Sequence, residues 1–170
     1  MTQAKPSGRA ARLLRWGAGP LIGTFTALWA GLMLLPGCLW AQTLSVTGLL
    51  LPGFTIAGAC LLAVGVPLYM ATALHLRSHR RTEGLVTSGP YRRIRHPLYA
   101  IGFLFLAPGV VLLLGSWPLL SVPIFMYLAA RLLIPAEERM LSATYGAAYA
   151  EYVASTGAFF PKSSQKRPQA

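Results

Sequence analysis

Residues 16–76 read WGAGPLIGTFTALWAGLMLLPGCLWAQTLSVTGLLLPGFTIAGACLLAVGVPLYMATALHL. This stretch contains no Lys, Arg, Asp or Glu. A helix that spans a membrane needs roughly 20 apolar residues. This stretch of 61 residues therefore fits two spans. A second uncharged stretch, residues 96–130, fits two shorter ones. Together the two stretches predict a membrane protein with four transmembrane helices.

The composition of the whole chain agrees with that prediction. Of its 170 residues, 55% are hydrophobic and only 11% are charged, whereas a soluble domain carries about 25% charged residues. We expect an all-α polytopic fold whose four spans cover residues 16–39, 49–76, 97–114 and 118–133. Gly115-Ser116-Trp117 joins the last two as a tight hairpin. Composition therefore excludes a soluble domain.

Two further features refine the expected helices. In the first span Gly19, Gly23, Ala27 and Gly31 recur every four positions, which predicts a close-packing helix face. After Pro135 the chain becomes polar and bears tyrosines, so we expect an amphipathic cytoplasmic helix over 136–155. Its tyrosines share one face by their spacing: Tyr145, Tyr149 and Tyr152.

The net charge of +11 is distributed on one side of this arrangement. Basic residues precede the first span, lie between the second and third, or lie at or beyond the end of the fourth. By the positive-inside rule both termini face the cytoplasm, in a chain whose composition is typical of a bacterial inner-membrane protein. Topology and anionic lipid explain the charge, so we expect no nucleic-acid partner. The chain divides into a basic arm (1–15), one membrane domain (16–161) and a polar tail (162–170).

The first group of residues that can carry chemistry is Arg95-His96-Pro97-Leu98-Tyr99. Proline suits the first turn of a helix, so Pro97 is expected to begin the third span. Arg95 and His96 then lie at its mouth, where the helix dipole favours an anion. Tyr99 lies one turn inside. The alternative is that these are ordinary residues of a membrane interface.

The second group is Glu137-Glu138, two of only four acidic residues in the chain. Acidic side chains at a membrane boundary are costly unless they are paired. One interpretation is a salt bridge to Arg139, Arg95 or another base. Combined with the first group, however, the pair predicts a site for a zwitterionic ligand.

His75 and His79, four residues apart, could form a metal site with His96 and Glu83. Three histidines are too few for a di-iron centre, so we favour hydrogen bonding at the helix end and predict no metal. Cys38 and Cys60 lie in apolar stretches without a spacing motif and predict neither a disulfide nor a zinc site.

Residues 85–161 resemble the isoprenylcysteine carboxyl methyltransferase family and its relatives, the phospholipid N-methyltransferases. The resemblance depends on an ordered set of motifs: Gly89-Pro90-Tyr91, Arg95-His96-Pro97-Leu98-Tyr99, a hairpin, Glu137-Glu138 with Leu141, Tyr145-Gly146, Tyr149, Tyr152 and Phe160-Pro161. Two positions depart from the family pattern. Ile101 stands where a glycine is usual, with Gly102 next, and no basic residue occurs over 157–160.

The resemblance implies an integral membrane enzyme that uses S-adenosylmethionine without a Rossmann domain. It implies methyl transfer to a carboxylate, or another polar head, of an isoprenoid- or lipid-like substrate. The cofactor-binding residues it implies are Tyr91, Arg95, His96, Pro97, Tyr99, Glu137 and Glu138. Arg95 and Glu138 would also be catalytic.

Three alternative functions remain. A phospholipid N-methyltransferase would need a base, for which His96 or a glutamate could serve. A sterol-reductase-like enzyme would share the C-terminal hairpin and use NADPH. A non-enzymatic membrane assembly protein would need none of this chemistry. The sequence does not specify an oligomeric state.

Overall fold

A computed structural model describes residues 17–40, 45–48, 50–79 and 84–162. Within these ranges four helical segments are long and apolar enough to cross a membrane: Gly19–Pro36, Leu50–His79, Pro97–Leu114 and Pro118–Tyr145. The chain is thus an all-α polytopic membrane protein, which confirms the predicted fold class. The expected arm (1–15) and all of the tail beyond Lys162 lie outside the described residues.

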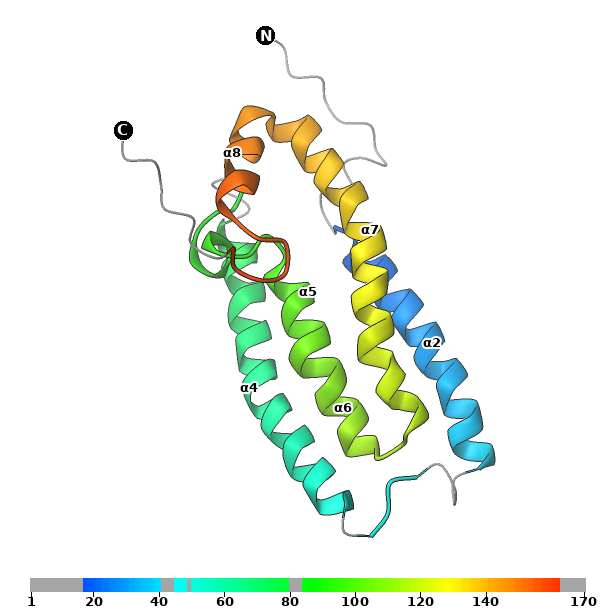
Figure 1. Cartoon of the computed structure of the whole chain (residues 1–170). Coiled ribbons are helices and arrows are strands. Elements are labelled where there is room, and N and C mark those ends of the chain that lie inside the picture. Colours follow the sequence, from blue (N-terminus) through cyan, green and yellow to red (C-terminus); the bar gives the residue numbers. More distant parts are fainter. Residues whose placement is uncertain (1–16, 41–44, 49, 80–83, 163–170) are drawn as a thin grey trace.

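The third and fourth spans form the centre of the bundle. Helix α4 (Leu50–His79) packs against helix α6 (Ala107–Leu114) on one side. Helix α2 (Gly19–Leu39) packs against helix α7 (Ser121–Tyr145) on the other, and Figure 1 shows α4 and α2 flanking the central pair. The polar segments are held at one end of this arrangement.

Glycines allow α4 to approach the third span closely, at η2 and at α6. A Cβ atom on Gly58 would lie 2.8 Å from the carbonyl oxygen of Gly109, and one on Gly65 would lie 2.6 Å from the Cβ of Phe105. Small residues are the usual means of close helix packing in membranes.

The close-packing face predicted for the first span is wrong. Gly23, Ala27 and Gly31 are exposed, and a Cβ atom on Gly23 or Gly31 would meet nothing within 4 Å. The helix instead packs through Ala18 and Ile22 near its beginning, which join the main core cluster. Further along, Trp29, Ala30 and Met33 pack against a second cluster of buried residues. The four-residue spacing of small side chains therefore marks an open face of α2.

The third span is interrupted, and the hairpin after it is tight. Helix α5 (Pro97–Ile101) is followed by a wide π turn, η2 (Gly102–Leu106), before α6 begins. Gly115 ends α6 in the left-handed region at φ 57°, as suits a glycine. A short 3-10 turn, η3 (Pro118–Leu120), then leads into α7. The predicted hairpin is confirmed.

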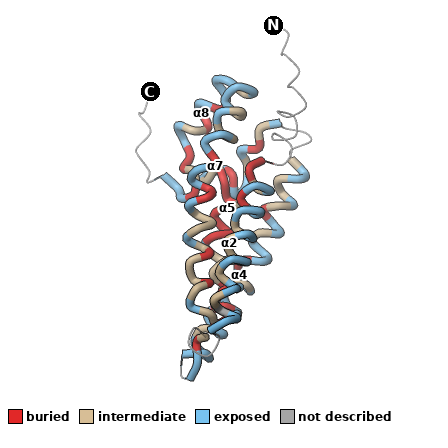
Figure 2. Tube along the Cα trace, turned by 90° about the vertical axis from the view of Figure 1, so that its right-hand side faces the viewer, coloured by how far each residue is buried: buried red, intermediate tan, exposed pale blue. Residues whose placement is uncertain are grey.

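The fourth span is longer than predicted. The sequence suggests that Pro135 ends it, but α7 continues through Pro135 to Tyr145. A proline within a helix loses one backbone hydrogen bond, and membrane helices tolerate this because neighbouring groups compensate. The chain breaks instead at Gly146, with φ 54°, and helix α8 (Ala147–Ser155) follows. Most buried positions lie in the half of the bundle that carries α8 (Figure 2).

Candidate functional site

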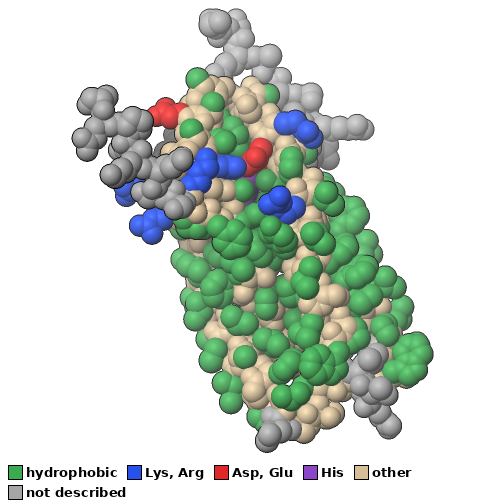
Figure 3. Space-filling view, in the orientation of Figure 1, with side chains coloured by type: hydrophobic (Ala, Val, Ile, Leu, Met, Phe, Trp, Pro, Cys, Tyr) green, Lys and Arg blue, Asp and Glu red, His purple; other side chains and the backbone are tan. Residues whose placement is uncertain are grey.

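Charged side chains gather at one end of the molecule, and the remaining surface in view is largely hydrophobic (Figure 3). We call this end the polar end. It comprises the loop before α5, the last turns of α7 and helix α8. The residues that the sequence singles out from the loop and from α7 meet here.

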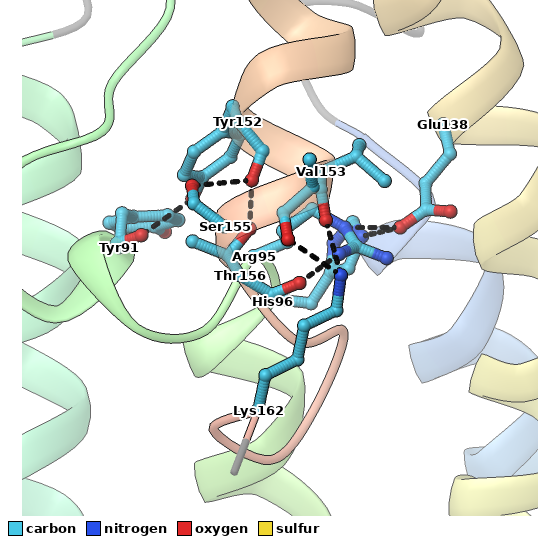
Figure 4. Close-up of polar contacts among 10 residues, drawn as sticks. Tyr91, Arg95, His96, Glu138, Tyr152, Val153, Ser155, Thr156 and Lys162 are labelled. Atoms are coloured by element: carbon cyan, nitrogen blue, oxygen red, sulfur yellow. Dashed lines mark hydrogen bonds and ion pairs between the residues drawn. The ribbon is translucent and has the colours of Figure 1, made fainter. Parts of the chain in front are cut away.

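Arg95 and Glu138 form an ion pair at the centre of the polar end (Figure 4). The Nε atom of Arg95 donates to Oε1 of Glu138 at 2.8 Å, and the two side chains are 10% and 26% exposed. The Nε2 atom of His96 lies 3.2 Å from the same oxygen. Nη1 of Arg95 donates to the carbonyl oxygen of Thr156 at 2.6 Å. One carboxylate oxygen therefore orients both basic side chains.

The segment after α8 fixes the backbone of Arg95 and His96. Their amide groups donate to the carbonyl oxygens of Gly157 at 2.8 Å and Ala158 at 3.0 Å. Gly157 leaves no room for a side chain, because a Cβ atom there would overlap the carbonyl oxygen of Phe160. None of the sequence motifs predicts this contact. The run of small residues Gly157-Ala158 is its only signal in the sequence.

Glu137 connects the first and third spans to the end of the fourth. Its Oε2 atom accepts from the amide of Ala18 at 2.9 Å and from the hydroxyl of Tyr99 at 3.1 Å. Gly17 adopts a positive φ of 64°, and a Cβ atom there would lie 2.8 Å from Oε1 of Glu137. The start of α2 is therefore part of the site, which the sequence motifs did not indicate.

A cavity of about 540 Å³ lies beside these groups. Its polar lining includes Tyr91, Arg95, His96, Tyr99, Glu137, Tyr145, Tyr149 and Tyr152. Its apolar lining includes Ile22, Gly23, Leu98, Gly102, Leu106, Ala107 and Met126. A volume of this order is typical of small-molecule sites, which are mostly apolar with a few placed polar groups.

The hydroxyl groups of two tyrosines of α8 differ in their hydrogen bonding. Tyr152 donates to the carbonyl oxygen of Tyr91 at 2.6 Å. Tyr149 is 3% exposed, and its hydroxyl has no hydrogen-bond partner within the described chain. Burial raises the pKa of Tyr152 to about 12, against the opposing effect of Arg95. Burial, followed by the charge of Glu138, raises the pKa of Tyr149 still further. Both phenols therefore stay protonated and remain donors.

The structure brings the predicted site residues together at the polar end, but not all of them line the cavity. Tyr91, Arg95, His96, Tyr99 and Glu137 line the cavity. Pro97 is buried as the first residue of α5, and Glu138 holds Arg95 and His96 through its Oε1 atom. The predicted salt bridge of the Glu137-Glu138 pair is thus confirmed for Glu138.

The two departures from the family pattern also have a structural outcome. Gly102 lines the cavity, and Ile101 is buried in the packing of α5. Beyond the segment that lacks a basic residue, Lys162 donates to the carbonyl oxygens of Val153 at 2.7 Å and Ala154 at 3.0 Å. Lys162 therefore satisfies carbonyl groups at the end of α8.

The histidines of α4 hydrogen-bond at the helix end, as predicted. The rings of His75 and His79 stack at 4.0 Å. Nε2 of His75 lies 3.1 Å from the hydroxyl of Ser88, and Nδ1 of His79 lies 3.0 Å from the carbonyl oxygen of His75. Across the described residues no group of three or more His, Cys, Asp or Glu is placed to hold a metal ion. Glu83 lies outside those residues.

Fold and site together define a polytopic membrane protein whose charged cavity is built on its last two spans. Residues 54–148 match the phospholipid methyltransferase family. That segment is more than half of the chain and contains both Arg95-His96 and Glu137-Glu138. The protein belongs to this family of membrane methyltransferases, which confirms the resemblance found in the sequence. No solved structure matches.

Two curated bacterial proteins are similar over part of their length. A cobalt-zinc-cadmium resistance protein of Cupriavidus metallidurans is 39% identical over 94 residues, which is 53% of this chain and 41% of that protein. A nickel-cobalt-cadmium resistance protein of Alcaligenes xylosoxydans xylosoxydans is 35% identical over 126 residues, 68% of this chain and 56% of that protein. The chain spans about half the length of the curated relatives it matches.

Proposed function

We propose that this protein transfers a methyl group from S-adenosylmethionine to the polar head of a lipid- or isoprenoid-like acceptor in the membrane. The observation that carries the proposal is the two-part lining of one cavity. Arginine, glutamate and phenol groups line its polar end, and apolar side chains of the spans line the rest. An amphipathic acceptor and a charged methyl donor match these two parts.

The polar groups fit the donor chemically. S-adenosylmethionine supplies an electrophilic methyl group and carries a carboxylate, an ammonium group and a sulfonium. Arg95 uses Nε and Nη1 for contacts within the protein, and we assign its remaining terminal nitrogen to the carboxylate. Oε1 of Glu137 is assigned to the ammonium group, since Oε2 already accepts from Ala18 and Tyr99.

The remaining predicted residues support this arrangement. The ring of Tyr99 stacks on that of His96 at 5.6 Å, and tyrosine faces attract a sulfonium by the cation–π effect. Tyr91 closes the cavity beside α8. Pro97 starts α5 and so directs its amide end toward the anion site. Glu138 acts by holding Arg95 and His96.

A carboxylate acceptor requires the fewest catalytic groups from this site. It is ionised at neutral pH and needs no base, so aligning it with the methyl group provides most of the catalysis. The family match favours a second candidate, an amine head group. His96 would then accept the proton at its Nδ1 atom, and the carboxylate of Glu138, which lies 3.2 Å from Nε2, would stabilise the resulting cation.

The site is proposed to face the cytoplasm from the inner membrane. Arginines cluster in the segments that the structure places at the polar end, as the positive-inside rule requires of a cytoplasmic face. Residues 16–161 would then act as one membrane domain, with the arm and the tail on the same side.

Binding and transfer can be tested on the purified protein in lipid nanodiscs. We expect thermal stabilisation by S-adenosylmethionine and S-adenosylhomocysteine, with none by NADPH. Labelled methyl should then pass into an added membrane lipid extract. Release of volatile methanol in base identifies a methyl ester, and base-stable label identifies N-methylation. Absence of binding by both adenosyl compounds overturns the proposal, and stabilisation by NADPH alone supports the reductase.

A cellular test separates the enzyme from an assembly protein. The double variant His96→Ala, Glu138→Ala is expected to fail in restoring a deletion strain to its original phenotype. Full restoration by this variant, at equal protein level, would support a non-enzymatic role.

A further inference from the structure

The start of the first span lies outside the segment that matches the family, yet it contacts the site. The family match covers residues 54–148, whereas Gly17 and Ala18 lie directly before helix α2. The amide of Ala18 donates to Oε2 of Glu137 at 2.9 Å, across 119 positions of the chain. Gly17 also lines the cavity. Anchoring the chain in the membrane would not require either contact.

The beginning of α2 is fixed by the same packing that fixes Glu137. Ala18 is 5% exposed and Ile22 is 1% exposed, and both belong to the core cluster that contains Ala130 and Ile134 of α7. The amide of Ile22 donates to the carbonyl oxygen of Ala18 at 3.0 Å, which ties Ala18 to the first turn of the helix. Ile134 precedes Glu137 by three residues on α7. One packed cluster therefore holds both the donor amide and the accepting carboxylate.

Two donors occupy one oxygen of Glu137 and leave the other. The hydroxyl of Tyr99 donates to Oε2 at 3.1 Å, beside the amide of Ala18. A carboxylate oxygen offers about two lone pairs, so both lone pairs of Oε2 are used. Oε1 accepts no hydrogen bond from any described residue. The two donors thus determine which oxygen of Glu137 is left for a ligand.

Gly17 leaves the space beside that oxygen empty. Its φ of 64° lies in the left-handed region that glycine adopts most easily. A Cβ atom at this position would lie 2.8 Å from Oε1 of Glu137 and 2.9 Å from the hydroxyl oxygen of Tyr99. Both atoms are the ends of side chains, so a larger residue would displace these two groups. A glycine at this position therefore keeps Oε1 uncovered.

We propose that Gly17 and Ala18 are positioning residues of the donor site, which together with Tyr99 present Oε1 of Glu137 to the ammonium group of the methyl donor. The proposal depends on the methyltransferase function proposed above. Both residues act through Glu137. The first span is thereby a functional part of the site, which the segment matching the family does not complete by itself.

The chemistry of Oε1 defines which ligand group it selects. An ionised carboxylate only accepts hydrogen bonds, and a primary ammonium group donates three. A charged pair of this kind makes a stronger hydrogen bond than a neutral pair does. The sulfonium and the adenosine part of the donor do not supply an ammonium group. Loss of the position of Oε1 should therefore weaken only those ligands that carry the ammonium group.

Gly17→Ala fills the space beside Oε1 and tests the proposal. Gly48→Ala is the matched control, because Gly48 has the same φ of 64°, a Cβ atom there would meet nothing within 4 Å, and it does not line the cavity. Ala18→Pro removes the donated amide, at a φ of −78° that proline can adopt. Calorimetry in nanodiscs compares S-adenosylhomocysteine with its deamino analogue, which keeps the carboxylate and lacks the ammonium group.

We expect Gly17→Ala and Ala18→Pro each to lower the affinity for S-adenosylhomocysteine by about tenfold. Affinity for the deamino analogue should equal that of Gly48→Ala. In a Glu137→Gln background neither change should lower the affinity for S-adenosylhomocysteine further, because residues that act through one group are not additive.

Three results would overturn the inference while leaving the proposed function intact. These are an unchanged affinity for S-adenosylhomocysteine in both variants, an equal loss for the two ligands, or a tenfold loss that persists in the Glu137→Gln background. The last two would show that the start of α2 supports the fold generally and does not act through Glu137. A parent protein that binds no adenosyl compound overturns the proposed function and this inference together.

Discussion

Glu138 is the side chain on which the order of the polar end depends most. Its Oε1 atom contacts both Arg95 and His96, which come from the loop before the third span. The family resemblance implies that Glu138 contacts the cofactor directly. In the structure it positions two neighbours, and Arg95 is the group that reaches the cavity.

Glu138→Gln tests this positioning role at nearly constant volume. Hydrogen bonds to charged groups contribute about 1.5–3 kcal/mol, so we expect the free energy of unfolding to fall by about 2 kcal/mol. Affinity for S-adenosylhomocysteine should fall as well. Thermal midpoint and calorimetric binding measure the two effects. Glu151→Gln is the control, since Glu151 is exposed on α8. Equal behaviour of the two variants would contradict the role.

The two tyrosines of α8 give a paired prediction. Tyr152→Phe removes the donor to the buried carbonyl oxygen of Tyr91 and should lower stability by about 1 kcal/mol. Tyr149→Phe removes a buried hydroxyl that has no partner in the described chain, so stability should stay equal or rise. Thermal midpoints of the two ligand-free variants decide this. A larger loss for Tyr149→Phe would refute the prediction.

At the scale of elements, the segment after α8 acts as a clamp on the loop before α5. Gly157 contributes its amide, which donates to the carbonyl oxygen of Arg93 at 3.3 Å, and its carbonyl oxygen, which accepts from Arg95 at 2.8 Å. No helix motif identifies this contact. It arises because the chain folds back after α8, so that residues 157–158 run alongside residues 93–96.

Gly157→Ala should release the clamp. The added Cβ would overlap the carbonyl oxygen of Phe160, so the backbone must shift and both hydrogen bonds to residues 93–95 weaken. We expect a loss of about 2 kcal/mol or more in the free energy of unfolding, together with weaker cofactor binding. Gly31→Ala, at an open helix position, should be neutral or stabilising. A neutral Gly157→Ala would refute the clamp.

The course of α7 shows where local rules mislead. Proline commonly ends a helix, and the polar residues after Pro135 indicate a separate amphipathic helix. The helix continues, and Gly146 makes the break instead. Glu137 and Glu138 consequently lie on a continuous helix. The preceding turns of this helix are fixed by Ala130 and Ile134, which are buried in the core cluster.

At the scale of the whole molecule, the polar end and the opposite end differ enough for chemical labelling to establish the orientation. Cys38 is exposed near the end of α2 that lies away from the polar end, and Cys60 lies within α4. A membrane-impermeant maleimide should label Cys38 in intact cells. Cys60 should stay unlabelled because an impermeant reagent does not reach a residue within the span Leu50–His79.

The polar end needs a reporter of its own. Lys162→Cys, in a background with Cys38→Ser and Cys60→Ser, should react only in inverted vesicles. The reverse pattern would place the site on the outer face and contradict the proposed location.

The spans, the hairpin, the polar end and the family could all be predicted from the sequence. These features depend on local properties: lengths of uncharged chain, turn residues such as Gly115, and short motifs such as Arg95-His96-Pro97. The residues of the site could be named for the same reason. Their roles could not, because a role depends on which neighbour a side chain meets.

The contacts between residues far apart in the sequence depend on the tertiary structure. It placed the amide of Ala18 on Glu137, 119 positions away, and Gly157 against the loop that carries Arg95. It also turned the small-residue face of α2 outward, where spacing alone predicted packing. The physical reason is that helix periodicity shows which residues share a face, whereas the partner of that face depends on contacts among all the helices. Gly23 therefore lines the cavity at an exposed position of α2, and the sequence pattern alone would have placed it between helices.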